Sequence, residues 1–305
     1  LSARSGISIY PKDAQEIDEL IRNANTAMYK AVENKVKYIY FNREMNEAIM
    51  ERLNLTSSLK AALDNKEFLL YYQPQYQTVD QKIIGFEALI RWNNPHMGMV
   101  SPAKFIPIAE ESQLIIPMGE WVLQTALEFL KKIRNKGYTD FVMSVNISVI
   151  QLMQNGFAEK VAELLDKEGI PAWCVEFEIT ESTMMESVES VIKNIQLLKE
   201  CGLKIALDDF GTGYSSLNYL TRLPINTLKI DKSFIDNIGQ IKEKSLLISS
   251  IVDIGLKLGL SVVAEGVETK EQFEYLKESS CERVQGFLLS KPLPEEEALN
   301  IIALS

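Results

Sequence analysis

Short apolar strands alternate with amphipathic helices along most of this chain, and this alternation limits the possible folds more than any other feature. Strand patterns occur at residues 68–75, 83–91, 141–147, 175–180, 203–207, 227–230, 261–264 and 283–285. Helical patterns lie between most of them, at residues 119–136, 157–168, 187–201, 242–258 and 270–279. Repeated units of this kind predict an α/β fold, a (β/α)8 TIM-like barrel rather than a doubly wound sheet. The connection at 76–82 is too short for a crossover helix, so we expect an antiparallel first strand.

Residues 1–46 follow a different pattern. They contain a strand pattern at 6–10 and an amphipathic helix at about 14–33, too little to form a core alone, so the apolar face of the helix needs a partner. That face carries Ile17, Leu20, Ile21, Ala24, Ala27 and Met28. A second, more polar helical stretch follows at about 43–65. We therefore divide the chain into a short N-terminal α+β remnant at 1–46, a helical linker at 47–66 and the barrel at 67–305.

Composition excludes several classes of function. A formal net charge of −10 argues against duplex nucleic acid as a partner. The three cysteines lie far apart and the chain has one histidine, so the sequence predicts neither a disulfide framework nor a Cys/His zinc site. This cysteine usage indicates the cytoplasm, and no apolar run approaches the length of a membrane span. Because the chain begins with Leu1 rather than Met, we expect it to be part of a longer protein, whose other parts could include a sensor or a membrane anchor.

Two adjacent carboxylates, Asp208 and Asp209, follow the apolar run at 203–207 and precede a glycine turn. Unpaired carboxylates at a buried strand end repel each other and lose hydration, so a cation usually compensates them. Alternatively, Asp209 caps the next helix while Asp208 points into solvent, and the pair alone does not decide between these readings. Other polar side chains at strand ends favour a metal site, because the carboxyl ends of barrel strands surround one mouth. They are Glu87, Asn146, Glu178, Glu181, Lys229, Asp231, Glu265, Glu268 and Gln285.

The candidate metal ligands are carboxylate and amide oxygens. Such a set favours hard cations, Mg²⁺ or Mn²⁺, whereas Ca²⁺ on the same oxygens would be structural or inhibitory. One carboxylate shared between two ions would create a two-metal site, which activates a bridging water and stabilises in-line displacement at phosphorus. The residue types therefore favour hydrolysis of a phosphodiester.

Lys229 lies between Leu228 and Ile230, and by strand alternation it faces the opposite side. If its neighbours pack on the helices, its amine points into the barrel beside the acids. There it could orient the attacking hydroxide or neutralise a phosphate, or it could form an ion pair in the core. The two roles are compatible, and we favour the functional one because burying a lysine is costly.

Seven separated motifs resemble, in order, those of the EAL domain, the cyclic di-GMP phosphodiesterase family. They are GFEALIRW at 85–92, SVNIS at 144–148, EITE at 178–181, DDFGTGYSSL at 208–217, LKID at 228–231, AEGVE at 264–268 and QG at 285–286. The resemblance covers about residues 60–305. It implies metal-dependent hydrolysis of one phosphodiester bond of cyclic di-GMP, which gives the linear dinucleotide pGpG.

The resemblance also implies roles for individual residues. The metal ligands would be Glu87, Asn146, Glu178 and Asp208 for the first ion and Asp208, Asp209 and Glu265 for the second. Asp208 would then bridge the two ions. Lys229 matches a lysine that interacts with the attacking water, and Gln285 matches a glutamine near the same water.

Substrate contacts are implied at four further positions. Arg91 matches an arginine placed to meet a phosphate, which suits its planar set of donors. Gln73 matches a position that contacts the nucleotide. Asp231 and Glu268 match additional acids that support ligands, water or substrate.

The segment 209–217 resembles a flexible loop that couples metal binding to dimerisation in this family. Glu181 would hold this loop through a hydroxyl such as that of Ser215. The implied partners are therefore cyclic di-GMP and a second copy of the barrel.

The N-terminal remnant resembles the C-terminal end of a GGDEF diguanylate cyclase domain. The similar stretches are GISIYP at 6–11 and ANTAMYKA at 24–31, and the cyclase signature itself is absent. Arg4 and Lys35 depart from the family pattern, in which a small hydroxyl residue and a glycine are usual. The resemblance implies that a GGDEF domain and a sensor domain precede this segment in the parent protein.

Two other functions stay open on the sequence. The barrel could bind cyclic di-GMP as a receptor without hydrolysing it, or act as a scaffold whose dimer matters more than turnover. Because every catalytic position named above is present, we favour hydrolysis.

Overall fold

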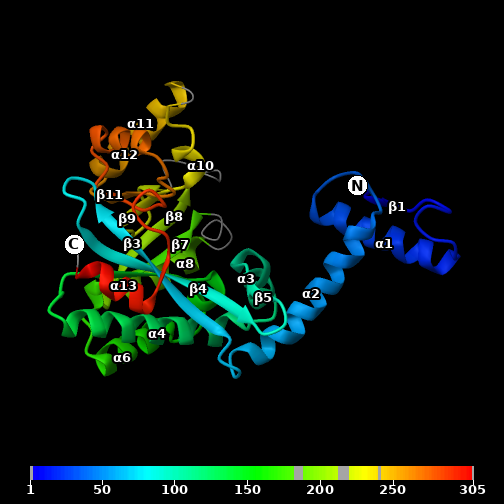
Figure 1. Cartoon of the computed structure of the whole chain (residues 1–305), viewed down its shortest axis with the longest axis horizontal. Coiled ribbons are helices and arrows are strands. Elements are labelled where there is room, and N and C mark those ends of the chain that lie inside the picture. The colour runs from blue at the N-terminus through cyan, green and yellow to red at the C-terminus, as the bar shows by residue number, and fades with distance from the viewer. Residues whose placement is uncertain (1–2, 182–187, 212–219, 240–241, 304–305) are drawn as a thin grey trace.

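A closed barrel forms the larger part of the molecule, as the alternation of strands and helices predicts (Figure 1). The computed structural model describes residues 3–181, 188–211, 220–239 and 242–303. Within these residues the barrel strands are β3 (Phe68–Gln77), β4 (Ile83–Asn94), β6 (Val142–Asn146), β7 (Val175–Thr180), β8 (Lys204–Phe210), β9 (Thr227–Ile230), β10 (Ser261–Ala264) and β11 (Arg283–Val284). The sheet closes because β3 pairs with both β4 and β11.

The direction of the strands places their carboxyl ends together. β3 runs antiparallel to β4, as its short connection predicts, while the pairings from β4 through β6, β7, β8, β9, β10 and β11 are parallel. The register between β8 and β9 shifts between Leu207 and Phe210. An irregularity of this kind redirects side chains at a strand end. It occurs at Asp208 and Asp209.

Helices surround the sheet and bury their apolar stripes against it. The longer ones are α4 (Ile115–Asn135), α6 (Phe157–Glu168), α8 (Val188–Glu200), α11 (Lys242–Lys257), α12 (Lys270–Glu278) and α13 (Glu295–Ile302). In α4, Ala126, Leu127, Leu130 and Ile133 are fully buried at helical spacing. Short elements complete the barrel: α5 (Val149–Leu152), the 3₁₀ turn η1 (Ala172–Cys174), α10 (Lys232–Ile235) and strand β12 (Leu293–Pro294).

A second apolar cluster joins the barrel to the helix that precedes it. Helix α2 (Arg43–Ala62) inserts Leu55 and Leu59 beside Phe105 of α3 (Pro102–Glu111). Phe68 and Trp92 of the barrel belong to the same cluster, and short strand β5 (Gly98–Val100) leads into α3. Ile90 and Trp121 pack against both this cluster and the main core.

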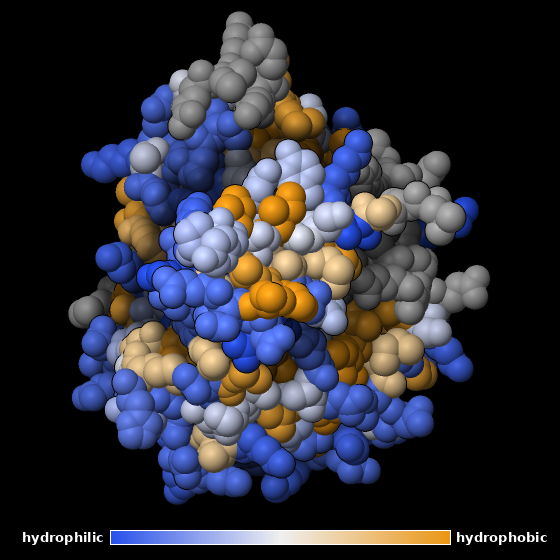
Figure 2. All heavy atoms as spheres, turned by 90° about the vertical axis from the view of Figure 1, so that its right-hand side faces the viewer, coloured by the Kyte–Doolittle hydropathy of each residue, from blue (hydrophilic) through white to orange (hydrophobic). Residues whose placement is uncertain are grey.

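The N-terminal unit lies at the far end of α2 from the barrel (Figure 1). Strands β1 (Ser5–Ile7) and β2 (Tyr38–Tyr40) form a parallel pair on which α1 (Ile17–Glu33) packs. A Cβ atom at Gly6 would lie 1.9 Å from the carbonyl oxygen of Ala24, so this close approach requires glycine. Ile17 and Tyr29 stay 73% and 70% exposed, and Figure 2 shows apolar side chains on this end of the molecule. The unit therefore covers only part of its apolar surface.

The structure also contains elements that the sequence pattern did not predict. Strands β2, β5 and β12 are three residues long or shorter, too short to carry a periodicity. Helix α1 begins at Ile17, three residues later than expected. None of the helices that the structure describes is long and apolar enough to cross a membrane.

Candidate functional site

The carboxyl ends of the barrel strands bring the predicted acids and Lys229 to one mouth. In β9, Leu228 and Ile230 pack in the main core, and Lys229 between them is 1% exposed. Glu178 in β7 is equally buried, and Glu87 in β4 and Asp208 in β8 are nearly so. Strand alternation thus directs these charged side chains to the interior of the barrel.

The amine of Lys229 is common to four carboxylates. Its Nζ atom lies 2.6 Å from Glu178 Oε2 and 2.6 Å from Glu265 Oε1. It lies 3.4 Å from Asp208 Oδ1 and 3.7 Å from Glu87 Oε2. Burial lowers the pKa of Lys229, but these carboxylates outweigh it and hold the pKa well above its ordinary value. Lys229 is therefore a charged group, and both predicted roles, ion pair and catalytic group, fit its position.

Amide side chains hold Glu87 from both sides. Asn146 donates from Nδ2 to Glu87 Oε1 at 2.8 Å, and Gln285 donates from Nε2 to Glu87 Oε2 at 2.6 Å. Gln285 also donates to Gln73 Oε1 at 3.0 Å. Burial raises the pKa of Glu87, yet Lys229 and these hydrogen bonds lower it overall. The arrangement fixes an ionised carboxylate between two amides.

The other acids are not fully compensated. Burial, together with the negative charge of Asp208, raises the pKa of Glu265 to about 8 and that of Asp209 to about 6. Burial and the charge of Glu87 raise the pKa of Glu178 well above its ordinary value. Glu178 Oε1 is also buried without a hydrogen-bond partner. The single positive charge of Lys229 does not balance the negative charges of these carboxylates. Carboxylate oxygens without a hydrogen-bond partner suit a hard divalent cation.

Asp208, Asp209 and Glu265 offer the closest group of candidate metal ligands. One carboxylate oxygen from each lies within 4.8 Å of the others. Asp209 adopts a positive φ of 55°, and its N–H donates to Asp208 Oδ1 at 2.9 Å. A non-glycine residue rarely adopts this conformation, so the surrounding structure holds it in place. Asp208 points to the shared mouth instead of the solvent, which favours the metal reading of the pair over the capping one.

We call the group formed around Lys229 by Glu87, Glu178, Asp208, Asp209 and Glu265 the acidic layer. Two predicted substrate-contacting acids, Asp231 and Glu268, bond to partners outside this group, although the negative charge of Asp231 also raises the pKa of Asp209. Asp231 caps α10, because its Oδ1 atom accepts the N–H of Ser233 at 3.0 Å. Glu268 is exposed and forms an ion pair with Lys232 at 2.6 Å. In this structure both acids have local partners, and their proposed contact with substrate stays a prediction.

Glu181 touches the start of the predicted coupling loop. Its Oε2 atom accepts the backbone N–H of Gly211 at 2.9 Å, and the residue is 1% exposed. A Cβ atom at Gly211 would lie 2.5 Å from the ring of Phe234, and φ is +98°, so only glycine fits. Ser215, the hydroxyl that the sequence analysis paired with Glu181, lies outside the described residues.

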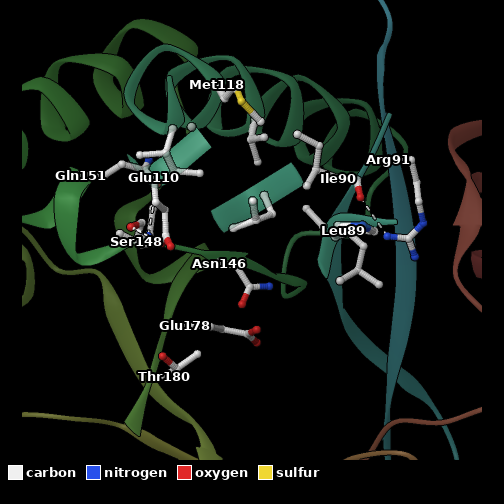
Figure 3. Close-up of a pocket in the computed structure, with 17 residues that line it drawn as sticks. Leu89, Ile90, Arg91, Glu110, Met118, Asn146, Ser148, Gln151, Glu178 and Thr180 are labelled. Carbon is white, nitrogen blue, oxygen red and sulfur yellow. Dashed lines mark hydrogen bonds between the residues drawn. The ribbon is translucent and has the colours of Figure 1, made fainter. Parts of the chain in front are cut away.

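A mostly apolar pocket of about 270 Å³ adjoins the acidic layer (Figure 3). Asn146 and Glu178 line it toward the acids, and Met118 of α4 lines another wall. Arg91 lies at a further side, where it donates from Nη1 to the carbonyl oxygen of Ile90 at 2.9 Å. The pocket therefore offers mostly apolar walls next to the acids, a setting suited to an apolar group of a ligand.

No pattern in the sequence assigns a role to the polar group in this pocket. Glu110 of α3 accepts a hydrogen bond from Ser148 Oγ at 2.6 Å (Figure 3). Gln151 completes a capping box with Ser148 and is packed against Gly119, whose Cβ would lie 1.8 Å from Gln151 Nε2. The Ser148-x-x-Gln151 spacing was a readable capping signal, but nothing in it points to α3.

Comparisons with known proteins identify the family to which the chain is similar. The EAL domain family model matches residues 56–292. "Bifunctional diguanylate cyclase/cyclic di-GMP phosphodiesterase MucR" of Pseudomonas aeruginosa is 39% identical over 304 residues, 99% of this chain and 44% of that protein. "Cyclic di-GMP phosphodiesterase PdeR" of Escherichia coli K12 is 36% identical over 96% of this chain and 44% of that protein.

A solved structure described as "PaMucR Phosphodiesterase, c-di-GMP complex" is 38% identical to this chain. It matches 80% of this chain and 99% of its own, with a TM-score of 0.77. The present chain spans less than half the length of the two relatives.

Proposed function

The chain belongs to the EAL domain family, and from this we propose that it is a metal-dependent phosphodiesterase that hydrolyses cyclic di-GMP to pGpG. In this reaction water adds across one phosphodiester bond and leaves a 5′-phosphate and a 3′-hydroxyl. The observation that carries the proposal is the group of four carboxylates around Lys229 Nζ. Both relatives named above include cyclic di-GMP phosphodiesterase in their names.

We infer that Mg²⁺ or Mn²⁺ is the cofactor, in a two-metal site. Its ligands would be Glu87, Asn146, Glu178, Asp208, Asp209 and Glu265. Hard cations suit these oxygens, and Ca²⁺ would bind them without supporting turnover. When bound, the metal supplies Lewis acidity toward phosphate oxygens and lowers the pKa of water.

The side chains of the chain itself would position the reactants. Lys229 presents a buried positive charge beside the acids, where it can orient the attacking water or offset charge on the phosphate. Gln285 holds Glu87 through Nε2, and its Oε1 atom can accept a hydrogen bond from the same water. Arg91 and Gln73 would contact phosphate and nucleotide, Asp231 and Glu268 would support substrate or water, and the apolar pocket would receive a base.

Incubation of the chain with cyclic di-GMP and Mg²⁺ or Mn²⁺ should yield pGpG, because ligands, lysine and pocket are all present. Chromatography of the nucleotides measures the product. Chelation by EDTA should stop the reaction, and added Mg²⁺ should restore it. Binding of cyclic di-GMP with no pGpG under any of these metals would make the barrel a receptor instead.

Affinity for Mg²⁺ should rise with pH. Asp209, with its pKa raised to about 6, and Glu265, with its pKa raised to about 8, hold protons below those values and must lose them to bind a cation. We therefore expect metal binding to release protons at neutral pH and affinity to level off above about pH 9. Titration calorimetry in buffers of different ionisation enthalpy measures this release. Equal affinity from about pH 6 to pH 9 would contradict the assignment of these carboxyls as ligands.

We propose that residues 1–46 are the C-terminal end of a GGDEF-like domain, that 47–66 form a linker, and that a GGDEF domain and a sensor precede them in the parent protein. The incompletely covered apolar surface of the N-terminal unit supports this, as does the greater length of the relatives. We further propose a cytoplasmic barrel, in keeping with its free cysteines, and a homodimer coupled to the site through Glu181 and Ser215.

A further inference from the structure

Two faces of helix α3 contact different parts of the molecule. Pro102, Ile106 and Glu110, spaced four residues apart, line the pocket beside the acids. Phe105, Ile108 and Ala109 are buried in the second apolar cluster. A rigid helix transmits a displacement of one face to the other, because its side chains share one backbone.

Helix α2 supplies the partner for the second face. Leu55 and Leu59, four residues apart and 4% and 2% exposed, belong to the same cluster as Phe105. Phe105 also meets Trp92 edge to face, with ring centres 5.6 Å apart. The apolar contact dominates this interface, because the ion pairs at its rim are exposed and such pairs contribute little.

The cluster that holds α2 also forms part of the pocket wall. Ile115 and Met118 belong to the cluster and line the pocket, and Met118 is visible at its edge in Figure 3. Ile90 and Ile106 pack against the cluster and line the pocket as well. Side chains shared by the cluster and the pocket thus connect α2 with the pocket wall.

The contact between α2 and α3 is not uniformly packed. An open surface groove of about 280 Å³ lies along the edge of this interface, and both Leu55 and Ile108 line it. Well-packed interiors leave little room for shifts, whereas side chains that face an open groove have no packed neighbour on that side, so the two helices can change their spacing at lower cost. At its other end α3 is held by the hydrogen bond from Ser148 to Glu110.

We propose that α2 is a positioning element for substrate binding: its contact with α3 sets the pocket wall, so that displacing α2 weakens binding of substrate and leaves the acidic layer unchanged. Leu55 and Leu59 are the positioning residues. The inference rests on the proposed function, because the pocket is taken to receive the base of cyclic di-GMP.

The test compares Leu55→Ala with Leu53→Ala in the full chain. Leu53 lies on the same helix and is 59% exposed, so its truncation matches the chemical change without touching the cluster. Leu55→Ala should raise KM for cyclic di-GMP about fivefold or more, which is the low end of the range for coupling between two separate sites. The value of kcat and the Mg²⁺ concentration that gives half-maximal activity should change little. Leu53→Ala should match the wild type, and amide exchange in α3 should quicken only in Leu55→Ala.

Other outcomes overturn the inference. Unchanged KM despite faster exchange in α3 would show that the wall does not depend on α2, and a fall in kcat alone would show an effect on the acidic layer. If Leu55→Ala lowers the melting temperature of the barrel, the milder Leu55→Val must show the same KM pattern or the inference fails. A wild-type chain that forms no pGpG would refute the proposed function instead, and the exchange comparison would still test the contact between α2 and α3.

Discussion

Replacement of Lys229 by alanine should lower kcat for cyclic di-GMP by about 10²- to 10⁴-fold, the range for loss of a positioned catalytic group, and change KM far less. The amine lies within 4 Å of four carboxylates that we propose as metal ligands. A fixed charge of this kind acts mainly on the charge that develops in the transition state. Steady-state kinetics at saturating Mg²⁺ separates kcat from KM.

Lys204→Ala is the matched control for Lys229→Ala. Lys204 begins β8 at the opposite end of the barrel and loses the same charge on substitution. It should keep wild-type kinetics. An effect of Lys229→Ala confined to KM would make Lys229 a substrate contact, because loss of ground-state binding leaves kcat unchanged.

Glu87→Ala should abolish pGpG formation while the barrel stays folded. Glu87 is held between Asn146 and Gln285 and approaches the amine of Lys229, so its loss removes a proposed ligand and the anchor of two amides. Loss of a supporting partner alone costs metal affinity about 10- to 100-fold, and loss of a ligand should cost more. The substitution leaves both apolar clusters intact, so we expect the barrel to stay folded with no large fall in the melting temperature.

Nucleotide chromatography measures the loss of pGpG formation, and circular dichroism measures whether the barrel stays folded. Glu282→Ala is the control, since Glu282 is an exposed acid at the other end of the barrel, bonded to Ser261. Turnover by Glu87→Ala at the wild-type rate would contradict the ligand assignment. It would favour a scaffold whose output does not depend on hydrolysis.

The barrel and its acidic layer could be predicted from the sequence because both follow from short periodic signals. The strand that carries Lys229 alternates between buried apolar residues and one lysine, which fixes the direction of the amine. Glu178 and Asp208 each lie two residues before the carboxyl end of neighbouring parallel strands, so their meeting follows from topology. The distances from Lys229 to each acid could not be predicted, because they depend on side-chain packing in the closed barrel.

The remaining features depend on contacts between segments far apart in the chain. Glu110 meets Ser148 across 38 residues, and no local pattern pairs them. Asp231 and Glu268 lie near the carboxyl ends of barrel strands, as most of the other acids do. Asp231, however, caps helix α10, and Glu268 pairs with Lys232. The position of an acid in the sequence does not reveal such local partners. The shape of the pocket likewise depends on how α3 packs against the barrel, because Pro102, Ile106 and Glu110 of this helix line it.

Separate apolar clusters for the barrel and for α2 have an evolutionary consequence. The barrel buries its own core, while α2 is joined to it through a compact joint built around Leu55, Leu59 and Phe105. Recombination can therefore exchange the segment that precedes α2 without changes in the core of the barrel, provided that the contact between Leu55, Leu59 and Phe105 is kept. A family built in this way can combine one kind of barrel with many different N-terminal segments.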